Sequence, residues 1–235
     1  MIYVLGGSTK MFAVIGVTYP AGSTCTCTNG TKTLKAKGTS GTAIFNVPST
    51  GTWTVTATNG DKTASKSVSI TAEGQTVVIG LSYALYDTGD ENESLTGGWE
   101  LINRSGGAAG SKTATALVSG TATTYLQNIF YTANVLDLSN YSTLKATITV
   151  KASGGSYPDE QFAAIGVTST DLSQYTSGSY PSTLLKYDTL FDIAGAKTTT
   201  VGSTTLSADV SAVSSGTVVL SFGWTTGSCS KIWLE

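Results

Sequence analysis

Apolar and polar residues alternate over short stretches along most of the chain, a pattern typical of half-buried β-strands. In the first third, turn signals separate these stretches, including Pro48-Ser49-Thr50-Gly51 and Asn-Gly pairs at 29–30 and 59–60. The alternation predicts strands over 12–18, 24–28, 31–37, 42–47, 52–58, 63–70 and 75–83. Short strands at this spacing are typical of a small β-sandwich.

The sequence pattern changes after residue 83, where we expect a second domain to begin. Further strands are predicted over 99–102, 113–118, 123–131, 135–138, 143–152, 161–168, 184–188, 197–201, 218–224 and 231–234, with LSADVSAVSSG as a loop before the penultimate strand. No long segment has the spacing of an amphipathic helix, so we predict an all-β protein. The expected organisation is an N-terminal segment over 1–10, a small sandwich over 11–83 and a larger sandwich over 84–235.

The Asn-Gly turn at 29–30 decides the environment of two cysteines. A two-residue turn places Cys25 opposite Leu34, and alternation then turns Cys25 and Cys27 toward the interior. Neighbouring positions on one face hold their Cβ vectors parallel, which disfavours a disulfide between them. A zinc site would need more ligands than one further cysteine, Cys229, and no histidine. We predict buried free thiols, which suit assembly in a reducing cytoplasm.

The second Asn-Gly turn is less regular. A two-residue turn at 59–60 puts Trp53 and Val55 on the same face as Lys62 and Lys66. Either the lysines lie at an open end with their stems along the core, or a β-bulge restores the usual alternation. We expect the bulge, with Trp53 as a core anchor.

The composition argues against nucleic-acid binding and against a membrane-spanning segment. Charged residues make up 12% of the chain, and the net charge is -2 with an isoelectric point near 5.1, which argues against nucleic-acid binding. No run of 18 apolar residues is present, so we expect no membrane span.

The apolar beginning of the chain does not read as a signal peptide. Its first basic residue is Lys10, and Gly6-Gly7 interrupts the apolar run. We therefore expect synthesis in a cytoplasm without export. The residues Ile2, Tyr3, Val4 and Leu5 form a candidate attachment strand that could pair with the edge of a neighbouring sheet.

Two parts of the sequence resemble known families. VTYPAGSTCTCTNGTKTLKA and FNVPSTGTWTVTATNGDKTASKSVSITAEGQTVVIGLSY resemble a module of structural proteins in tailed bacteriophages of gut Firmicutes, and also transthyretin-like, carboxypeptidase-regulatory-type and Ig-like β-sandwiches. The residues that carry this likeness are Pro48, Gly51, Thr52 to Val55, Val68 to Ile70, Val77, Ile79 and Leu81 to Tyr83. LDLSNYSTLKATITV and the ending from LSADV resemble jelly-roll domains of phage fibres and carbohydrate-binding modules. That likeness implies that the first and last strands of the second sandwich pair.

Little in the sequence points to catalysis. Without histidine, no Ser-His-Asp or Cys-His arrangement exists. The carboxylates nominally available for a glycosidase pair are Asp87, Asp90, Glu91, Glu93, Asp159 and Glu160. Solvated loop charge is the simpler interpretation, and we predict no enzymatic activity. A calcium site formed by Asp87, Asp90 and Glu91 stays open, because these residues offer several oxygens on one short loop. No other cofactor is expected.

Three tyrosines, Tyr175, Tyr180 and Tyr187, lie in a long segment rich in Ser, Thr and Gly. Three interpretations stay open for them. They could cap one end of the sandwich, contact a partner subunit or stack against a glycan.

These observations and the phage resemblance favour a non-enzymatic virion protein exposed on the particle, as a tail fibre, tail accessory or capsid decoration. Its partners would be other virion proteins and host-surface glycans. The weakly charged surface, rich in Thr and Ser, favours a homo-oligomer, a trimer in the case of a fibre. The alternative is a secreted carbohydrate-binding module, and a depolymerase fragment is a third hypothesis.

Overall fold

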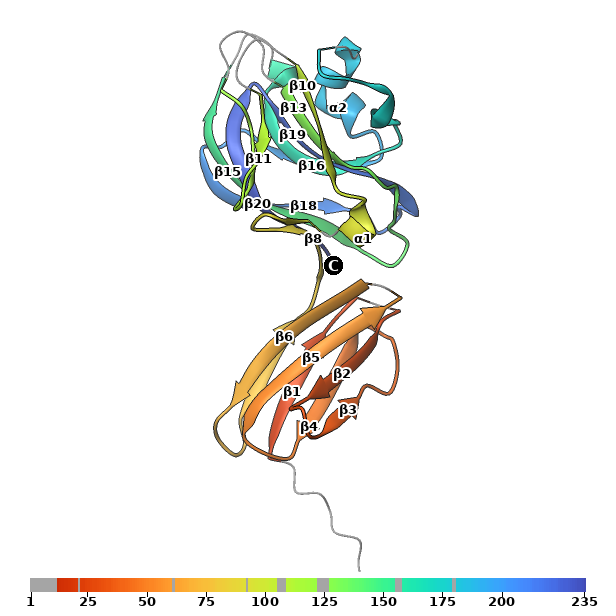
Figure 1. Ribbon diagram of the computed structural model, residues 1–235, viewed down its shortest axis with the longest axis vertical. Helices are drawn as coiled ribbons and strands as arrows, with labels where there is room; N and C mark the ends of the chain where they lie inside the picture. The colour runs from red at the N-terminus through yellow and green to blue at the C-terminus, as the bar shows by residue number, and fades with distance from the viewer. Residues whose placement is uncertain are drawn as a thin grey trace, which may run out of the picture. The chain divides into compact units, whose positions relative to one another are not determined.

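The regular secondary structure of the chain is almost all β-strand, as expected. The computed structural model describes residues 12–20, 22–60, 62–91, 93–104, 109–121, 127–154, 158–178 and 181–235. The chain divides into two compact units between Ser82 and Tyr83, one residue before the expected boundary (Figure 1). Among the described residues, no helix is long and apolar enough to cross a membrane. The expected N-terminal segment, with Ile2 to Leu5, lies outside the described residues.

The first unit is a sandwich of two sheets. Its strands are β1 (Ala13–Thr18), β2 (Thr24–Thr28), β3 (Thr33–Lys35), β4 (Thr42–Val47), β5 (Gly51–Asn59), β6 (Lys62–Ile70) and β7 (Thr76–Gly80). One sheet has the order β4-β1-β7 and the other β3-β2-β5-β6. The first and last strands, β1 and β7, pair in parallel. Inward residues of both sheets, with Ile15, Phe45 and Trp53 among them, form the core.

The β2–β3 hairpin confirms the predicted orientation of the cysteines with a different register. Cys27, not Cys25, lies opposite Leu34, so the loop holds four residues rather than two. The Asn29 side chain closes this loop by accepting hydrogen bonds from the backbone N–H groups of Thr31 and Lys32, at 3.1 and 2.8 Å. A shift by two residues keeps every side chain on its face, so Cys25 and Cys27 still point into the core.

The expected bulge in the β5–β6 hairpin is wrong. The ladder runs without interruption from Gly51–Ile70 to Asn59–Lys62, and it places Val55 directly opposite Lys66. Lys66 is nevertheless exposed, because β6 is the outer strand of its sheet. An inward-directed lysine on an outer strand keeps its charge in water and discourages pairing with another sheet.

The second unit is a larger sandwich that contains short helical turns. Its strands are β8 (Tyr83–Asp87), β9 (Asp90–Glu91), β10 (Trp99–Arg104), β11 (Ser111–Lys112), β12 (Leu117–Val118), β13 (Gln127–Thr132), β14 (Leu136–Asp137), β15 (Thr143–Ser153), β16 (Phe162–Thr168), β17 (Ala194–Thr198), β18 (Gly202–Asp209), β19 (Ser215–Gly223) and β20 (Thr225–Leu234). The turns are α1 (Glu93–Thr96), η1 (Pro158–Glu160), η2 (Leu172–Gln174), η3 (Ser182–Leu185) and α2 (Tyr187–Leu190).

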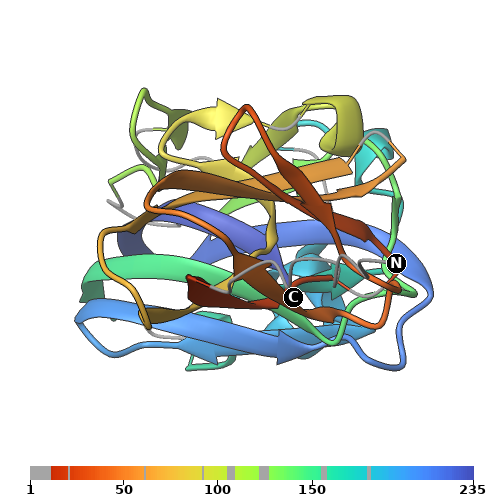
Figure 2. The ribbon, with the colours of Figure 1, turned by 90° about the horizontal axis from the view of Figure 1, so that it is seen from below.

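Two sheets form this sandwich. One has the order β10-β13-β19-β16-β17, with β14 also paired to β19. The other has the order β11-β12-β20-β15-β18, and β8 joins it by pairing with the far end of β20, as the jelly-roll resemblance implies. In Figures 1 and 2, β18 runs along β15 at one edge. Part of LSADVSAVSSG therefore extends β18, and only the residues between β18 and β19 form a loop.

The sheet that contains β16 and β19 is buried on both faces. All residues of β13 and β16 are buried, without the alternation of a solvent-facing strand. The segment with η2, η3 and α2 lies against the face turned away from β15 and β20 (Figure 1). Residues 184–188, predicted as a strand, lie in η3 and α2, because Leu184 and Leu190 pack onto the sheet from short helical turns.

Candidate functional site

The outer face of the sheet that contains β20 presents a tryptophan within a frame of charged side chains. Alternation along β20 turns Lys231 and Trp233 to this face and Ile232 and Leu234 into the core, and Glu235, directly after the strand, lies exposed beside Trp233. Trp233 lies opposite Lys145 of β15 on one side and Ala84 of β8 on the other. Trp233 is therefore held between strands on both sides, with its indole half-buried.

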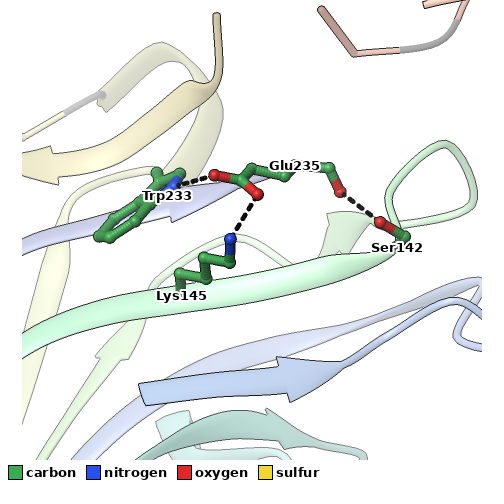
Figure 3. Close-up of polar contacts among 4 residues, drawn as sticks. All are labelled: Ser142, Lys145, Trp233 and Glu235. Carbon is green, nitrogen blue, oxygen red and sulfur yellow. Dashed lines mark hydrogen bonds and ion pairs between the residues drawn. The ribbon is translucent and has the colours of Figure 1, made fainter. Parts of the chain in front are cut away.

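Hydrogen bonds fix the indole of Trp233 (Figure 3). Its Nε1–H donates to Oε1 of Glu235 at 2.9 Å. The second carboxylate oxygen, Oε2, lies 2.6 Å from Nζ of Lys145. The backbone carbonyl of Glu235 accepts from the Ser142 hydroxyl at 3.3 Å. Glu235 thus links the tryptophan to the next strand.

A second ion pair lies on the other side of the ring. Nζ of Lys231 is 2.7 Å from Oδ2 of Asp87 and 5.9 Å from the centre of the Trp233 ring. We call Asp87, Lys145, Lys231, Trp233 and Glu235 the tryptophan platform. It offers one aromatic surface, two ammonium donors and two carboxylate acceptors, and its charges balance.

The surroundings of Glu235 lower the pKa of its carboxyl group. Partial burial of the carboxyl group would raise its pKa. Hydrogen bonds from Lys145 and Trp233, together with the charge of Lys145, outweigh burial and hold the pKa below its ordinary value. The carboxylate is therefore ionised at neutral pH and available as an acceptor.

The candidate calcium ligands are only partly described. Asp87 joins the platform and pairs with Lys231. Asp90 and Glu91 form β9, and their side chains lie outside the described part of the structure. No group of three or more His, Cys, Asp or Glu residues within that part could hold a metal ion. The calcium site stays a prediction.

The tyrosines belong to a different face of the second unit. Tyr175 and Tyr187 pack half-buried on the cluster that covers the β16–β19 sheet. The Tyr187 ring lies 5.7 Å from Phe162 and 5.0 Å from Phe191, and Nζ of Lys197 sits 4.2 Å from its centre. Through these contacts, Tyr187 helps to hold the segment with η2, η3 and α2, which we call the covering segment, against the sheet. Tyr180 lies outside the described residues.

Sequence reasoning missed the tryptophan platform. The signal is KIWLE at 231–235, which places Lys231, Trp233 and Glu235 at alternate positions of a strand and hence on one face. It also missed Trp224, which joins β19 to β20 at a φ of 43° and donates its indole N–H to Oε2 of Glu160 at 3.1 Å. A positive φ is uncommon for a tryptophan, and Trp224 is a further half-buried aromatic of this unit.

Comparisons with known proteins give only distant structural likenesses. No protein-family model and no curated protein matches the chain. A DUF4876 family protein from Bacteroides thetaiotaomicron VPI-5482 is 12% identical, over 65% of this chain and 42% of its own, with a TM-score of 0.20. A proposed carbohydrate binding protein from Bacteroides uniformis ATCC 8492 is 10% identical over 96% of this chain and 99% of its own, with a TM-score of 0.25.

A third structure comes from work on carbohydrate-binding modules of the β-sandwich superfamily. It is 14% identical, over 91% of this chain and 85% of its own, with a TM-score of 0.25. The chain spans less than half the length of the DUF4876 protein. None of these three structures serves as a guide to the site residues of this chain, because their TM-scores are low.

Proposed function

We propose that this protein is a non-catalytic glycan-binding protein whose second unit binds a neutral sugar on the tryptophan platform. The observation that supports this most directly is the half-buried indole of Trp233, held by Glu235 on an outer sheet face between two ion pairs. An aromatic ring fixed in this way provides a flat apolar surface with a polar rim.

The chemistry of the platform suits a sugar ring. The C–H face of a pyranose is apolar and can lie on an indole, while its hydroxyl groups point outward and both donate and accept. Lys145 and Lys231 can donate to such hydroxyls, and Glu235 and Asp87 can accept from them. Because the charged groups are already paired, little side-chain freedom is lost when the sugar binds.

Placement on a phage particle stays a prediction. A glycan-binding face would serve host attachment by a virion protein as well as it would serve a secreted module. The homo-oligomer, the trimeric fibre and the attachment strand Ile2–Leu5 likewise stay predictions. Capsid, portal and tail genes beside the coding sequence would favour the virion, and polysaccharide-degrading genes would favour the secreted module.

A glycan array with the full-length protein, followed by calorimetry on the best neutral glycan, tests the proposed function. We expect Trp233→Ala to abolish binding and Trp233→Phe to keep most of it, because phenylalanine retains a ring. Lys145→Ala should weaken binding by about 2- to 5-fold, the effect of one exposed polar contact. Lys151→Ala is the matched control, since Lys151 is an exposed lysine on the same strand.

Thermal unfolding of each variant separates loss of the site from loss of the fold. A folded Trp233→Ala protein that still binds at full strength would rule out the platform. Release of reducing ends from a bound polysaccharide would contradict the non-catalytic assignment.

A further inference from the structure

The first unit contains a cavity that the proposed function does not use. It has a volume of about 290 Å³ and lies between β2 and the segment that follows β3. Its lining residues are Thr24, Cys25, Thr26, Lys35, Ala36, Lys37, Gly38 and Thr39. The cavity forms because β3 ends at Lys35, after which the chain leaves the regular ladder.

Backbone contacts hold this segment in place. The N–H of Ala36 donates to the carbonyl of Cys25 at 2.9 Å, which anchors the segment at its beginning. Farther along, the N–H of Gly22 donates to the carbonyl of Thr39 at 2.8 Å. The Tyr19 hydroxyl donates to the carbonyl of Gly38 at 2.9 Å. The cavity is therefore built into the fold before any ligand arrives.

Two threonines that line the cavity have hydroxyl oxygens that can accept hydrogen bonds. The Thr24 hydroxyl donates to the carbonyl of Thr58 at 3.2 Å, and the Thr26 hydroxyl donates to the carbonyl of Thr56 at 3.5 Å. A hydroxyl has one hydrogen to donate and two lone pairs that can accept. With that hydrogen directed at β5, each oxygen is left to accept a hydrogen bond from a ligand.

Two lysines of the lining supply positive charge. Lys35 and Lys37 are both exposed, and neither forms an ion pair with another described residue. No acidic residue lines the cavity. The surrounding unit is basic as well, since residues 12–82 include five lysines and two acidic residues. A ligand of this cavity thus meets two cations and two hydroxyl acceptors.

We propose that this cavity binds an oxyanion that carries neighbouring hydroxyl groups, namely the phosphate or carboxylate of an acidic sugar or polyol. The ammonium groups of Lys35 and Lys37 bind the anion, and the hydroxyls of Thr24 and Thr26 accept from the ligand's own hydroxyls. This site is independent of the tryptophan platform, because every residue involved belongs to the first unit.

Nuclear magnetic resonance titration of the full-length protein tests this site. Glycerol 3-phosphate and glucuronate serve as the phosphate and carboxylate probes, and glucose serves as the neutral one. We expect both acids, or one of them, to shift the amide signals of Gly38 and Thr39, and glucose to leave them unchanged. The acid that binds more tightly identifies the source of the anion.

Variants assign the contacts. Lys35→Gln and Lys37→Gln should each weaken binding by about 2- to 5-fold, as expected for exposed ion pairs, and higher salt should weaken it further. Lys66→Gln is the matched control, because Lys66 is an exposed lysine of the same unit outside the cavity. Thr24→Val and Thr26→Val keep the shape of the lining and remove its acceptors, so they should weaken binding of the same probes.

Three results would overturn the proposal: no shift with either acid, equal shifts with glucose, or affinities that the lysine variants leave unchanged. Because these lysines are exposed, their variants are expected to fold, which the amide spectrum checks directly. Loss of neutral-sugar binding in Trp233→Ala would leave this titration unaffected, so the two proposals can fail separately.

Discussion

Trp233 depends on the ionised form of Glu235 for its fixed orientation. The pKa of this carboxyl group lies below its ordinary value of 4.5, and the chain has no histidine that titrates near neutrality. We therefore expect glycan affinity to stay constant between about pH 5 and about pH 8. It should fall as the pH drops below 4.5, when Glu235 takes up a proton and loses Lys145.

Calorimetric affinity across this range measures the effect of pH on binding. Glu235→Gln should bind with an affinity that changes less in acid than that of the unmodified protein. The same carboxylate contributes to stability above its unfolded pKa, and this contribution is lost as the pH falls through the lower folded value. A decline in affinity centred between pH 6 and 7 would contradict this assignment to Glu235.

The three cysteines are buried as thiols. Cys25, Cys27 and Cys229 are free, and none is more than 2% exposed. Burial raises the pKa of Cys25 and Cys27 from 9.0 to about 11, and that of Cys229 to about 12. Because the thiolate is the reactive form, alkylation of the native protein at about pH 8 should be roughly 100-fold slower than in denaturant.

Mass spectrometry after timed exposure to iodoacetamide measures the alkylation rate, with the urea-unfolded protein as the reference. Rapid labelling of both Cys25 and Cys27 would contradict their packing. Raised thiol pKa values also make stability depend on pH. The free energy of unfolding should be steady below pH 9.0 and decrease as the pH rises toward about 11.

At the scale of elements, the strands of the first unit followed from alternation, whereas the hairpin registers did not. Alternation has a period of two, so it fixes the face of Cys25 and Trp53 without fixing the partner of each residue. The four-residue loop depends on how the Asn29 side chain accepts from two backbone N–H groups, and Asn-Gly also suits a two-residue turn. The expected bulge is unnecessary because β6 is the outer strand of its sheet, where Lys66 stays exposed.

The second unit was harder to predict, because its segments depend on tertiary burial. β16 is apolar along nearly its whole length, and that pattern does not reveal what covers its second face. The covering segment is rich in polar residues, and a few widely spaced apolar side chains, Leu172, Leu184, Leu190 and Phe191 among them, pack it onto the sheet. The platform was missed because charged residues around a tryptophan on an outer face look like an ordinary solvated strand.

The tight packing between β16 and β17 can be tested by comparing Gly166, which lies in β16, with Gly154, which lies in neither strand. A Cβ atom added to Gly166 would lie 2.3 Å from the backbone carbonyl oxygen of Ala194, so β17 would have to move away from β16. Gly166→Ala should therefore lower the free energy of unfolding by about 1–3 kcal/mol. Gly154→Ala is the control, since no atom lies within 4 Å of its added Cβ.

Urea denaturation followed by circular dichroism compares the two glycine variants. Equal stability of the Gly166 and Gly154 variants would show that β17 can move away from β16 without cost. The glycan affinity of both proteins should match the unmodified chain, because neither glycine lies on the platform.

At the scale of the whole molecule, the first and last strands of each unit pair with one another. The β1–β7 pairing lies within the first unit, and the β8–β20 pairing lies within the second. Fragments covering 12–82 and 83–235 should therefore each unfold cooperatively, with the glycan-binding activity in the second. Thermal denaturation of each fragment measures this, and a fragment without a cooperative transition would show that the units need one another.

The two pairings give the units different responses to mechanical tension. In the first unit, β1 and β7 are parallel, so the chain enters at one end of their ladder and leaves at the other. A pull along the chain loads all of these hydrogen bonds in shear. In the second unit, Tyr83 at the start of β8 lies opposite Leu234 at the end of β20, so the same pull peels the bonds apart in succession. Under a rising load in an optical trap, the second unit should open first, while the first unit still bears the force.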